Sequence, residues 1–297
     1  DYHIFSGDQP FLAYPRVMGH ELAGEVVEAD EGAALKVGQL VTVNPYIPCG
    51  DCIACRKSKP NCCVKINVLG VHVDGGMTEF IWVPAAAVIP VDGLTPDQAA
   101  MVEFLAVGAH AVRRGQTTKG DRALVVGAGP IGVGVALFCK FAGAEVTLID
   151  TSADRLNYAR DKVGIDHVGQ VGDELEDFLK GRSDGEYFDV VFDATGNGKA
   201  IEKGFSYVAH GGRYVLVSVV KDVISFSDPE FHKRETTLLG SRNATREDFE
   251  YVIEKLRSGA IPSEMLQTHN FDLMDTPPMI RDRVADKFSG VKAIATL

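Results

Sequence analysis

The chain has 297 residues, of which 45% are hydrophobic and 24% charged, and its formal net charge is −11. This composition indicates a globular protein that is long enough for two domains with separate cores. The negative charge argues against a nucleic-acid-binding surface, and no apolar stretch approaches the roughly 18 residues of a membrane span. Because no secretory signal precedes the fold, we expect a cytoplasmic protein.

The first hundred residues are rich in short apolar segments separated by turn residues. Examples are GEVVEA, QLVTV and EFIWV. Segments of this length and spacing predict short antiparallel strands arranged as a barrel or a sandwich. A cysteine-rich loop interrupts the pattern.

That loop, PCGDCIACRKSKPNCC, contains a C-x2-C-x2-C-x7-C pattern formed by Cys49, Cys52, Cys55 and Cys63. Four thiolates suit tetrahedral zinc, and a site filled entirely by protein ligands would be structural. A disulfide cluster or an iron–sulfur site is also compatible with the spacing. Cys62 lies outside the pattern, and Cys139 lies in an apolar run that predicts burial.

From about residue 104 the sequence alternates between strand-like and helix-like segments. ALVVGAG, EVTLID, YFDVVFDATG and GRYVLVSV predict strands, whereas PIGVGVALFCKFAG, SADRLNYARDK and GKAIEKGFSYVA predict helices. The alternation indicates βαβ units and a doubly wound parallel sheet, so the fold class is α/β.

After about residue 239 the alternation stops. TREDFEYVIEKLRSG predicts an amphipathic helix with Gly259 near its end, and VKAIATL predicts a terminal strand. The simplest arrangement is a β-rich domain, residues 1–103 and 240–297, split around an α/β domain of residues 104–239.

A glycine-rich motif, GAGPIG, follows the strand-like ALVV and opens a helix-like segment. Gly127, Gly129 and Gly132 suit the tight turn, the approach of a pyrophosphate and the close packing of helix on strand. Pro130 suits a first helical turn, and Ile131 completes the motif. The motif predicts a dinucleotide site; a glycine turn without a nucleotide is the alternative.

Asp150 ends the next predicted strand, 18 residues after Gly132. A carboxylate at this place accepts hydrogen bonds from the adenosine ribose and repels a 2′-phosphate, which favours NAD over NADP. Arg155 follows closely and could pair with a 2′-phosphate instead. Thr195, in the later DATG turn, is a weaker candidate for the nicotinamide side, and an ordinary turn is its alternative.

Several polar residues stand out in the remaining sequence. His20 and Glu21 are adjacent in GHELAGEVVE, Glu103 lies in the apolar run VEFLAVGAHA, and His3 lies in DYHIF. A carboxylate in an apolar run is costly unless it is paired or bound to a metal. Taken singly, however, such residues are more often structural than functional.

Together these segments resemble the zinc-dependent medium-chain alcohol dehydrogenase/reductase superfamily, in its sorbitol and threonine dehydrogenase branch. The similar segments are GHELAGEVVE, the cysteine loop, DGGMTEFIWVPA, VEFLAVGAHA, GAGPIG with Asp150, and GSRNATREDF, in family order over essentially the whole chain. The resemblance implies a GroES-like β-rich catalytic domain split around a Rossmann domain, a structural zinc, a catalytic zinc and NAD. Polyol and sugar-acid oxidoreductases are the most similar group.

The resemblance also implies roles for individual residues. His20 corresponds to a catalytic zinc ligand, Glu103 to the glutamate of the sorbitol dehydrogenase type, and Glu21 to a residue beside the metal. His3 corresponds to a histidine that passes the substrate proton to solvent. Arg242, in GSRN, corresponds to a position near the polar end of the substrate pocket, with a surface arginine as the alternative.

Two departures from the family pattern matter. The family usually has Glu-Pro-Leu where this chain has Glu103-Phe104-Leu105. The catalytic cysteine of the family lies in a C-G-x-D-like segment whose aspartate corresponds to Asp1, so the cysteine would precede residue 1. We therefore expect either further residues upstream or an incomplete catalytic zinc site.

The expected reaction is hydride transfer between a secondary alcohol, such as a polyol or sugar acid, and NAD. A threonine-type amino-alcohol dehydrogenase is the alternative, and a nucleotide-binding sensor without turnover is a second alternative. The expected partner is a small-molecule alcohol or ketone, with no nucleic acid or membrane involved. The resemblance further implies a homodimer or homotetramer.

Overall fold

The computed structural model describes residues 2–7, 13–285 and 290–297. The chain forms two compact units. Unit 1 consists of residues 1–106 and 243–297, and unit 2 consists of residues 107–242. Each unit is described by itself below.

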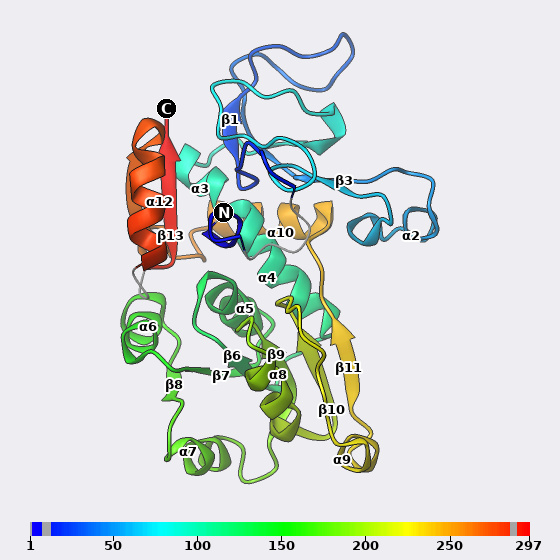
Figure 1. Ribbon diagram of the computed structural model, residues 1–297, viewed down its shortest axis with the longest axis vertical. Coiled ribbons are helices and arrows are strands. Elements are labelled where there is room, and N and C mark those ends of the chain that lie inside the picture. The colour runs from blue at the N-terminus through cyan, green and yellow to red at the C-terminus, as the bar shows by residue number, and fades with distance from the viewer. Residues whose placement is uncertain (1, 8–12, 286–289) are drawn as a thin grey trace. The chain divides into compact units, whose positions relative to one another are not determined.

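Unit 2 is built on a six-stranded sheet whose neighbouring strands are all parallel, with β8 and β11 at its two edges (Figure 1). The strand order is β11-β10-β9-β6-β7-β8. The strands are β6 (Arg122–Val126), β7 (Glu145–Asp150), β8 (His167–Gln170), β9 (Phe188–Asp193), β10 (Val208–Leu216) and β11 (Thr237–Gly240). The predicted doubly wound parallel sheet is therefore confirmed.

Helices connect these strands as the alternating sequence predicts. They are α5 (Pro130–Phe141), α6 (Ala153–Tyr158), α7 (Leu175–Arg182), α8 (Gly198–Gly204) and α9 (Asp228–Lys233), with single turns at Ala159–Val163 and Phe205–Tyr207. Pro130 opens α5, where its missing N–H leaves no bond unmade. The run from Gly132 to Cys139 is buried, so α5 packs as a core helix.

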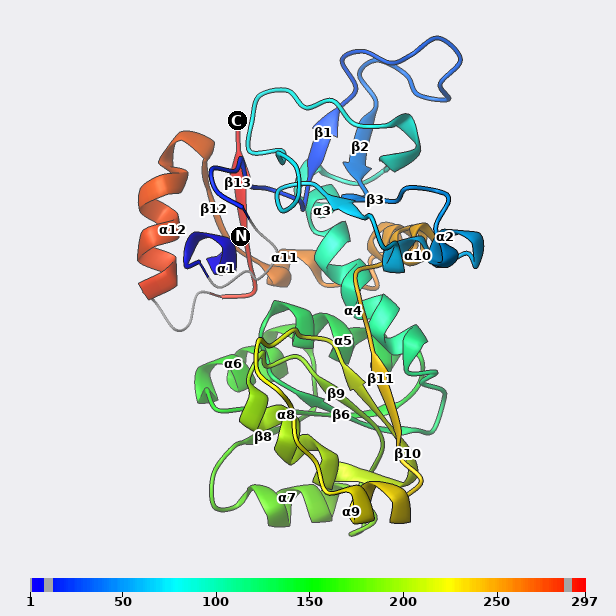
Figure 2. The same ribbon diagram turned by 45° about the vertical axis from the view of Figure 1, so that its right-hand side comes forward.

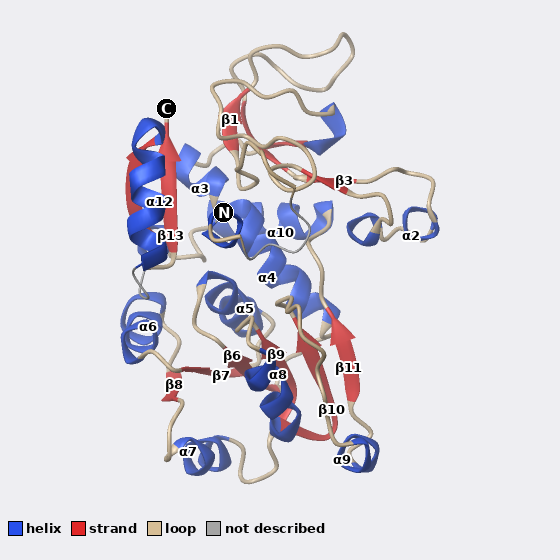
Figure 3. Ribbon diagram, viewed as in Figure 1, coloured by secondary structure: helices blue, strands red, loops and turns tan. Residues whose placement is uncertain are grey.

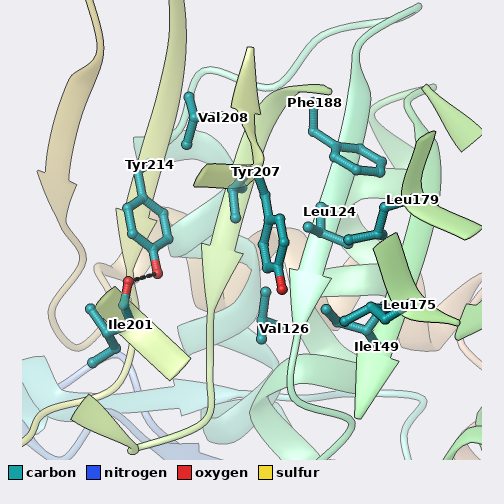
Figure 4. Packing of buried hydrophobic residues seen from close by; sticks show 11 residues of the cluster. Leu124, Val126, Ile149, Leu175, Leu179, Phe188, Ile201, Tyr207, Val208 and Tyr214 are labelled. Carbon is teal, nitrogen blue, oxygen red and sulfur yellow. Dashed lines mark hydrogen bonds between the residues drawn. The ribbon is translucent and has the colours of Figure 1, made fainter. Parts of the chain in front are cut away.

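The core of unit 2 has a cluster of eleven buried residues contributed by strands and helices alike (Figure 4). Aliphatic side chains such as Leu124 and Leu179 are fully buried there. Tyr214 is also fully buried, and its hydroxyl donates to the carbonyl oxygen of Ile201 at 2.9 Å. The buried hydroxyl of Tyr214 therefore has a hydrogen-bond partner.

Unit 1 contains smaller sheets and more loop. An antiparallel sheet has the order β1-β2-β5, β3 pairs with β4 in antiparallel fashion, and β12 runs parallel to β13, beside α12 (Figure 2). The strands are β1 (Ala23–Glu25), β2 (Leu40–Val43), β3 (Tyr46–Ile47), β4 (Asn67–Val68), β5 (Val88–Pro90), β12 (Gln267–Asp272) and β13 (Lys292–Thr296).

The helices of unit 1 are mostly short. They are α1 (Tyr2–Phe5), α2 (Ile53–Arg56), α3 (Pro96–Ala100), α10 (Arg246–Arg257), α11 (Ser263–Leu266) and α12 (Thr276–Ala285), with single turns at Pro60–Cys62, Ala85–Ala87 and Leu273–Asp275. The longer helix α4 (Val102–Arg114) contains the unit boundary. Thr245 and Asp248 form a reciprocal capping box that starts α10.

One predicted strand is not formed. The segment EFIWV, residues 79–83, is loop, and Phe80 and Trp82 are 62% and 78% exposed (Figure 3). A strand needs a hydrogen-bonded neighbour, and none of the segments that the structure describes pairs with this one. The predicted strand in GEVVEA is likewise shortened to β1.

In the described part of the chain, no helix combines the length and the apolar character that crossing a bilayer requires.

Candidate active site

The cysteine loop lies between β3 and β4 and brings four thiols together. The sulfur atoms of Cys49, Cys52, Cys55 and Cys63 all lie within 4.8 Å of one another. In residues 2–7, 13–285 and 290–297, no other group of three or more metal-binding side chains meets this spacing. Four thiols so placed match the donor set of a tetrahedral zinc site.

The charges of these thiols are controlled by neighbouring groups. The backbone N–H of Cys55 lowers the pKa of the Cys52 thiol to about 6, and that of Cys49 lowers the pKa of Cys63. The Asp51 side chain and burial raise the pKa values of Cys49 and Cys55, respectively. Neighbouring groups therefore favour the thiolate form at Cys52 and Cys63 and oppose it at Cys49 and Cys55, and metal binding, which requires thiolates, would release protons.

His20 follows Gly19, a position at which the backbone conformation requires glycine. Gly19 has a φ of 98°, and a Cβ on it would lie 2.9 Å from the backbone nitrogen of Met77. The N–H groups of Gly76 and Met77 donate to the carbonyls of Gly19 and Met18 at 2.9 and 3.0 Å. This loop fixes His20 just before β1, and burial lowers the pKa of its imidazole, which favours the neutral, metal-binding form.

Glu21 forms an ion pair with a residue near the other end of the chain. Lys292, on β13, donates to Glu21 Oε2, and the side chains of the two residues are 10% and 22% exposed. Burial alone would raise the pKa of Glu21, but the charges of Lys292 and His20 outweigh it, so the pKa is lowered. Glu21 is thus an ionised carboxylate whose charge is balanced by Lys292.

Glu103 lies in the first turn of α4 and is only 3% exposed. The hydroxyl of Tyr46, on β3, donates to Glu103 Oε1. Burial raises the pKa of Glu103, whereas the charge of His20 opposes the rise. Burial and the Glu103 charge raise the pKa of Tyr46, so its phenol keeps its proton and acts as the donor.

Together His20, Glu21, Glu103 and Lys292 form an electrostatically coupled cluster within unit 1. With both carboxylates ionised, two negative charges face the single positive charge of Lys292. Because a buried charge is costly unless it is balanced, this cluster fits an added cation.

In unit 2 the GAGPIG motif forms the predicted turn between β6 and α5. Gly127 has a φ of 103°, and a Cβ on Gly132 would lie 1.7 Å from the carbonyl oxygen of Gly127. By contrast, a Cβ on Gly129 would meet no heavy atom within 4 Å. The turn therefore packs as the dinucleotide fingerprint requires and leaves open space at its middle glycine, which fits a pyrophosphate.

Asp150, at the end of β7, lies against this turn. Its Oδ2 atom accepts from the backbone N–H of Ala128 at 2.6 Å, and its Oδ1 atom accepts from that of Ser152 at 2.8 Å. Arg155 lies in α6, where its N–H donates to the capping Ser152 Oγ at 3.4 Å. The structure thus brings Asp150 and the glycine motif together.

Thr195 follows β9 and also contacts the glycine turn. A Cβ on Gly127 would lie 3.0 Å from the carbonyl oxygen of Ala194 and 3.3 Å from Thr195 Cγ2. The Thr195 hydroxyl donates to the buried Asp193. The ends of β6, β7 and β9 therefore place the predicted cofactor residues along one sheet edge.

His3 and Arg242 are the two remaining residues for which the sequence predicts a role. The backbone of His3 belongs to α1, but its side chain lies outside the described residues. Arg242 is exposed, two residues after β11.

Known proteins match over nearly the whole chain. Residues 1–93 match the alcohol dehydrogenase GroES-like domain, and residues 130–258 match the zinc-binding dehydrogenase family. The chain is 44% identical to the L-galactonate-5-dehydrogenase of Escherichia coli K12 over 272 residues, which are 91% of this chain and 80% of that protein. The chain belongs to the zinc-type medium-chain alcohol dehydrogenase family.

Solved structures agree with this assignment. The dehydrogenase superposes on the RspB alcohol dehydrogenase of Escherichia coli CFT073, a complex with NADH, with a TM-score of 0.91 and 29% identity over 99% of this chain and 87% of that one. It also matches the L-idonate 5-dehydrogenase of Escherichia coli K-12 with a TM-score of 0.88 and 27% identity, covering 99% and 86% of the two chains. The predicted family branch, the α/β fold with a GroES-like part and the oxidoreductase class are confirmed.

Two residues that contact the carboxylates of Glu103 and Glu21 escaped sequence reasoning. Lys292 was detectable only as a lone charge in the apolar terminal strand VKAIATL, and Tyr46 carried no motif at all. Their partners lie 271 and 57 residues away in sequence, so only the fold reveals the contacts.

Proposed function

We propose that this dehydrogenase oxidises a secondary hydroxyl group of a sugar acid such as L-galactonate, with NAD⁺ as the hydride acceptor. The observation that carries the proposal is the 44% identity to an L-galactonate-5-dehydrogenase across 91% of the chain. The structural match to an L-idonate 5-dehydrogenase supports the same substrate class, because both names describe polyhydroxy acids oxidised at position 5.

His20 and Glu103 are the proposed ligands of the catalytic zinc, with Glu21 beside it. The grouping of one imidazole and two carboxylates around a single cation, Lys292, supports this assignment. Zinc bound there would polarise the substrate oxygen and ease the loss of the hydroxyl proton. Tyr46 would keep Glu103 oriented, Lys292 would balance Glu21, and His3 would carry the released proton towards solvent.

The cofactor site is proposed at the ends of β6, β7 and β9. Gly127, Gly129 and Gly132, with Pro130 and Ile131, would form the turn that receives the pyrophosphate. Asp150 would accept the adenosine ribose hydroxyls, with Arg155 close by, and Thr195 would face the nicotinamide half. The geometry of the turn and the NADH in the RspB structure support this arrangement.

The four-cysteine loop is the proposed structural zinc site, and Arg242 is the proposed contact for the polar end of the substrate. We further propose that the protein acts in the cytoplasm as a homodimer or homotetramer. All six cysteines are free thiols, which suits a reducing compartment.

Substrate oxidation tests the proposal directly. Formation of NADH is followed by absorbance with L-galactonate, L-idonate, sorbitol and L-threonine, each with NAD⁺ and with NADP⁺. We expect the largest kcat/KM with a sugar acid and NAD⁺. A larger value for L-threonine would replace the substrate assignment with the amino-alcohol alternative, and a preference for NADP⁺ would reject the cofactor assignment.

The zinc assignment has its own test. His20→Ala should abolish turnover and remove one zinc per chain while the cysteine-bound zinc remains. His210→Ala, at an exposed position of unit 2, should change neither quantity and serves as the control. Turnover that survives His20→Ala on every substrate would exclude zinc-assisted chemistry at this residue.

A further inference from the structure

The carboxylate of Asp193 is fully buried at the end of β9. Its Oδ1 atom accepts three hydrogen bonds: from the Thr195 N–H at 3.1 Å, the Thr195 hydroxyl at 2.9 Å and the Ser218 hydroxyl at 3.0 Å. All three donors are neutral. Three donors on one oxygen are typical of an ionised carboxylate rather than of a protonated one.

The orientation of the two hydroxyl groups follows from their other bonds. The Gly196 N–H donates to Ser218 Oγ at 2.9 Å, and the Asn197 N–H donates to Thr195 Oγ1 at 3.1 Å. Each hydroxyl oxygen therefore accepts from the backbone and directs its single proton to Asp193. The carboxylate thus organises the loop from Thr195 to Asn197.

No cation neutralises this carboxylate within the described residues. There, the groups that act on the Asp193 carboxylate are the neutral Thr195 and Ser218, and no lysine, arginine or histidine pairs with it. An unbalanced buried charge is costly, and burial raises the pKa of Asp193. A positive charge brought close to Asp193 would offset this cost.

The position of Asp193 in the sheet indicates which ligand could bring that charge. The chain runs from β6 outward through β7 to β8 and then returns to β9 on the other side of β6. Dinucleotides bind across the strand ends at such a reversal, with one half of the cofactor on each βαβ unit. Asp150 marks the adenosine half, so the loop after β9 faces the nicotinamide half.

We propose that Asp193 determines the preference of the site for the oxidised cofactor. This inference rests on the proposed binding of NAD. The nicotinamide ring of NAD⁺ carries a positive charge that NADH lacks, so a buried carboxylate nearby stabilises NAD⁺ selectively. A single charge of this kind, partly screened, changes the affinity ratio of the two forms by about fivefold.

Titration of the protein with each cofactor form tests the proposal. Dissociation constants for NAD⁺ and NADH are measured from the quenching of protein fluorescence in wild type and in Asp193→Asn, which has the same shape without the charge. We expect the affinity for NAD⁺ to fall about fivefold relative to that for NADH. If the ratio of the two affinities is unchanged in Asp193→Asn, whether both stay the same or both fall equally, the proposal is overturned.

The matched control is Asp189→Asn, in the same strand. Asp189 lies at the opposite part of β9 and accepts from the Arg122 N–H at 2.7 Å. We expect this variant to keep the wild-type ratio, and an equal shift in both variants would contradict a specific role of Asp193. Asp193→Ser, also uncharged, provides the same comparison should Asp193→Asn not fold.

Ser218→Ala distinguishes an effect of the Asp193 charge on the affinity ratio from an effect of the position of the loop. It removes one neutral donor but leaves the carboxylate, so both affinities should fall together and their ratio should stay. A shift in the ratio for this variant as large as for Asp193→Asn would assign the effect to loop position and overturn the proposal. A wild-type protein that binds neither NAD⁺ nor NADH would reject the proposed cofactor as well, which distinguishes the two failures.

Discussion

Single buried contacts decide the properties of the cluster that His20, Glu21, Glu103 and Lys292 form in unit 1. Glu21 and Glu103 are both carboxylates near His20, yet they are stabilised in different ways. Glu21 is balanced by the charge of Lys292, whereas Glu103 accepts a hydrogen bond from the neutral phenol of Tyr46. The charge of Glu21 is therefore largely offset, whereas the hydrogen bond to Glu103 brings no compensating charge.

Replacing Lys292 by methionine should strongly destabilise the protein. It leaves the Glu21 carboxylate buried without its cation, a change that costs about 3–5 kcal/mol. Urea unfolding measures the effect, and Lys292→Met combined with Glu21→Gln should recover most of the loss. The exposed Arg246–Glu250 pair is the control, because Arg246→Ala should cost less than about 1 kcal/mol. Equal effects at the two pairs would contradict a structural role for the buried one.

Tyr46→Phe tests the second contact. Removing the hydroxyl leaves a buried carboxylate without its donor, which should cost about 1–3 kcal/mol of unfolding free energy. Tyr214→Phe removes an equally buried hydroxyl from a neutral carbonyl and should cost about 1 kcal/mol. In a Glu103→Leu background, which lacks the acceptor, Tyr46→Phe should lose its cost. A cost that persists there would show that the Tyr46 hydroxyl acts through a partner other than Glu103.

At the scale of elements, the cysteine loop and the glycine turn are maintained by different forces. Helix α2 has four residues, and none of them is buried. So short a helix is not stable by itself, and no apolar core compensates. The glycine turn, in contrast, is maintained by the close packing of β6 against α5.

Cys52→Ser should therefore unfold the cysteine loop locally. We expect the loss of about one zinc per chain and faster tryptic cleavage after Arg56 and Lys57, because structural zinc contributes folding free energy. Cys62→Ser leaves the four sulfur ligands intact and should keep both zinc content and protease resistance. Metal analysis and limited proteolysis measure the two quantities, and identical behaviour of both variants would rule out the four-cysteine site.

Two alanine substitutions in the glycine motif should affect different properties: Gly132→Ala the stability of the fold, and Gly129→Ala the binding of the cofactor. Gly132→Ala places a Cβ 1.7 Å from the Gly127 oxygen, so the turn must shift at a cost of about 3 kcal/mol. Gly129→Ala meets no heavy atom within 4 Å and should change stability by less than about 1 kcal/mol. It should nevertheless weaken NADH binding at least about tenfold, since the methyl group occupies the space of the pyrophosphate. Normal NADH binding by Gly129→Ala would place the cofactor elsewhere.

For the whole molecule, the sequence predicted those structural features best whose determining residues lie close together in the chain. GAGPIG predicts its turn because Gly127 and Gly132 answer steric demands between close neighbours in the chain, and the cysteine spacing predicts the cluster because its four residues are also close in sequence. The alternation of ALVVGAG and EVTLID with apolar helices also predicted the doubly wound parallel sheet of unit 2, because strands joined through helices run parallel.

The sequence predicted least where a contact joins distant segments. EFIWV has the composition of a strand, yet pairing depends on a neighbour that the sequence does not identify. Lys292 and Glu21 are 271 positions apart in the sequence, so the sequence does not indicate that they form a pair. His20 and Glu103 therefore could be singled out from the sequence, whereas the partners of Glu21 and Glu103 could not.

The two units should respond separately to their ligands. NADH bound in unit 2 should slow amide hydrogen exchange in residues 127–132 and 195–197, by up to about 2.7 kcal/mol of protection at a hundredfold excess over the dissociation constant. A zinc chelator should instead accelerate exchange in residues 49–63 of unit 1. Mass spectrometry of peptic fragments resolves these segments, and Gly129→Ala with NADH serves as the unprotected control. Protection of residues 49–63 by NADH, without protection of the glycine motif, would contradict the assignment of the cofactor to unit 2.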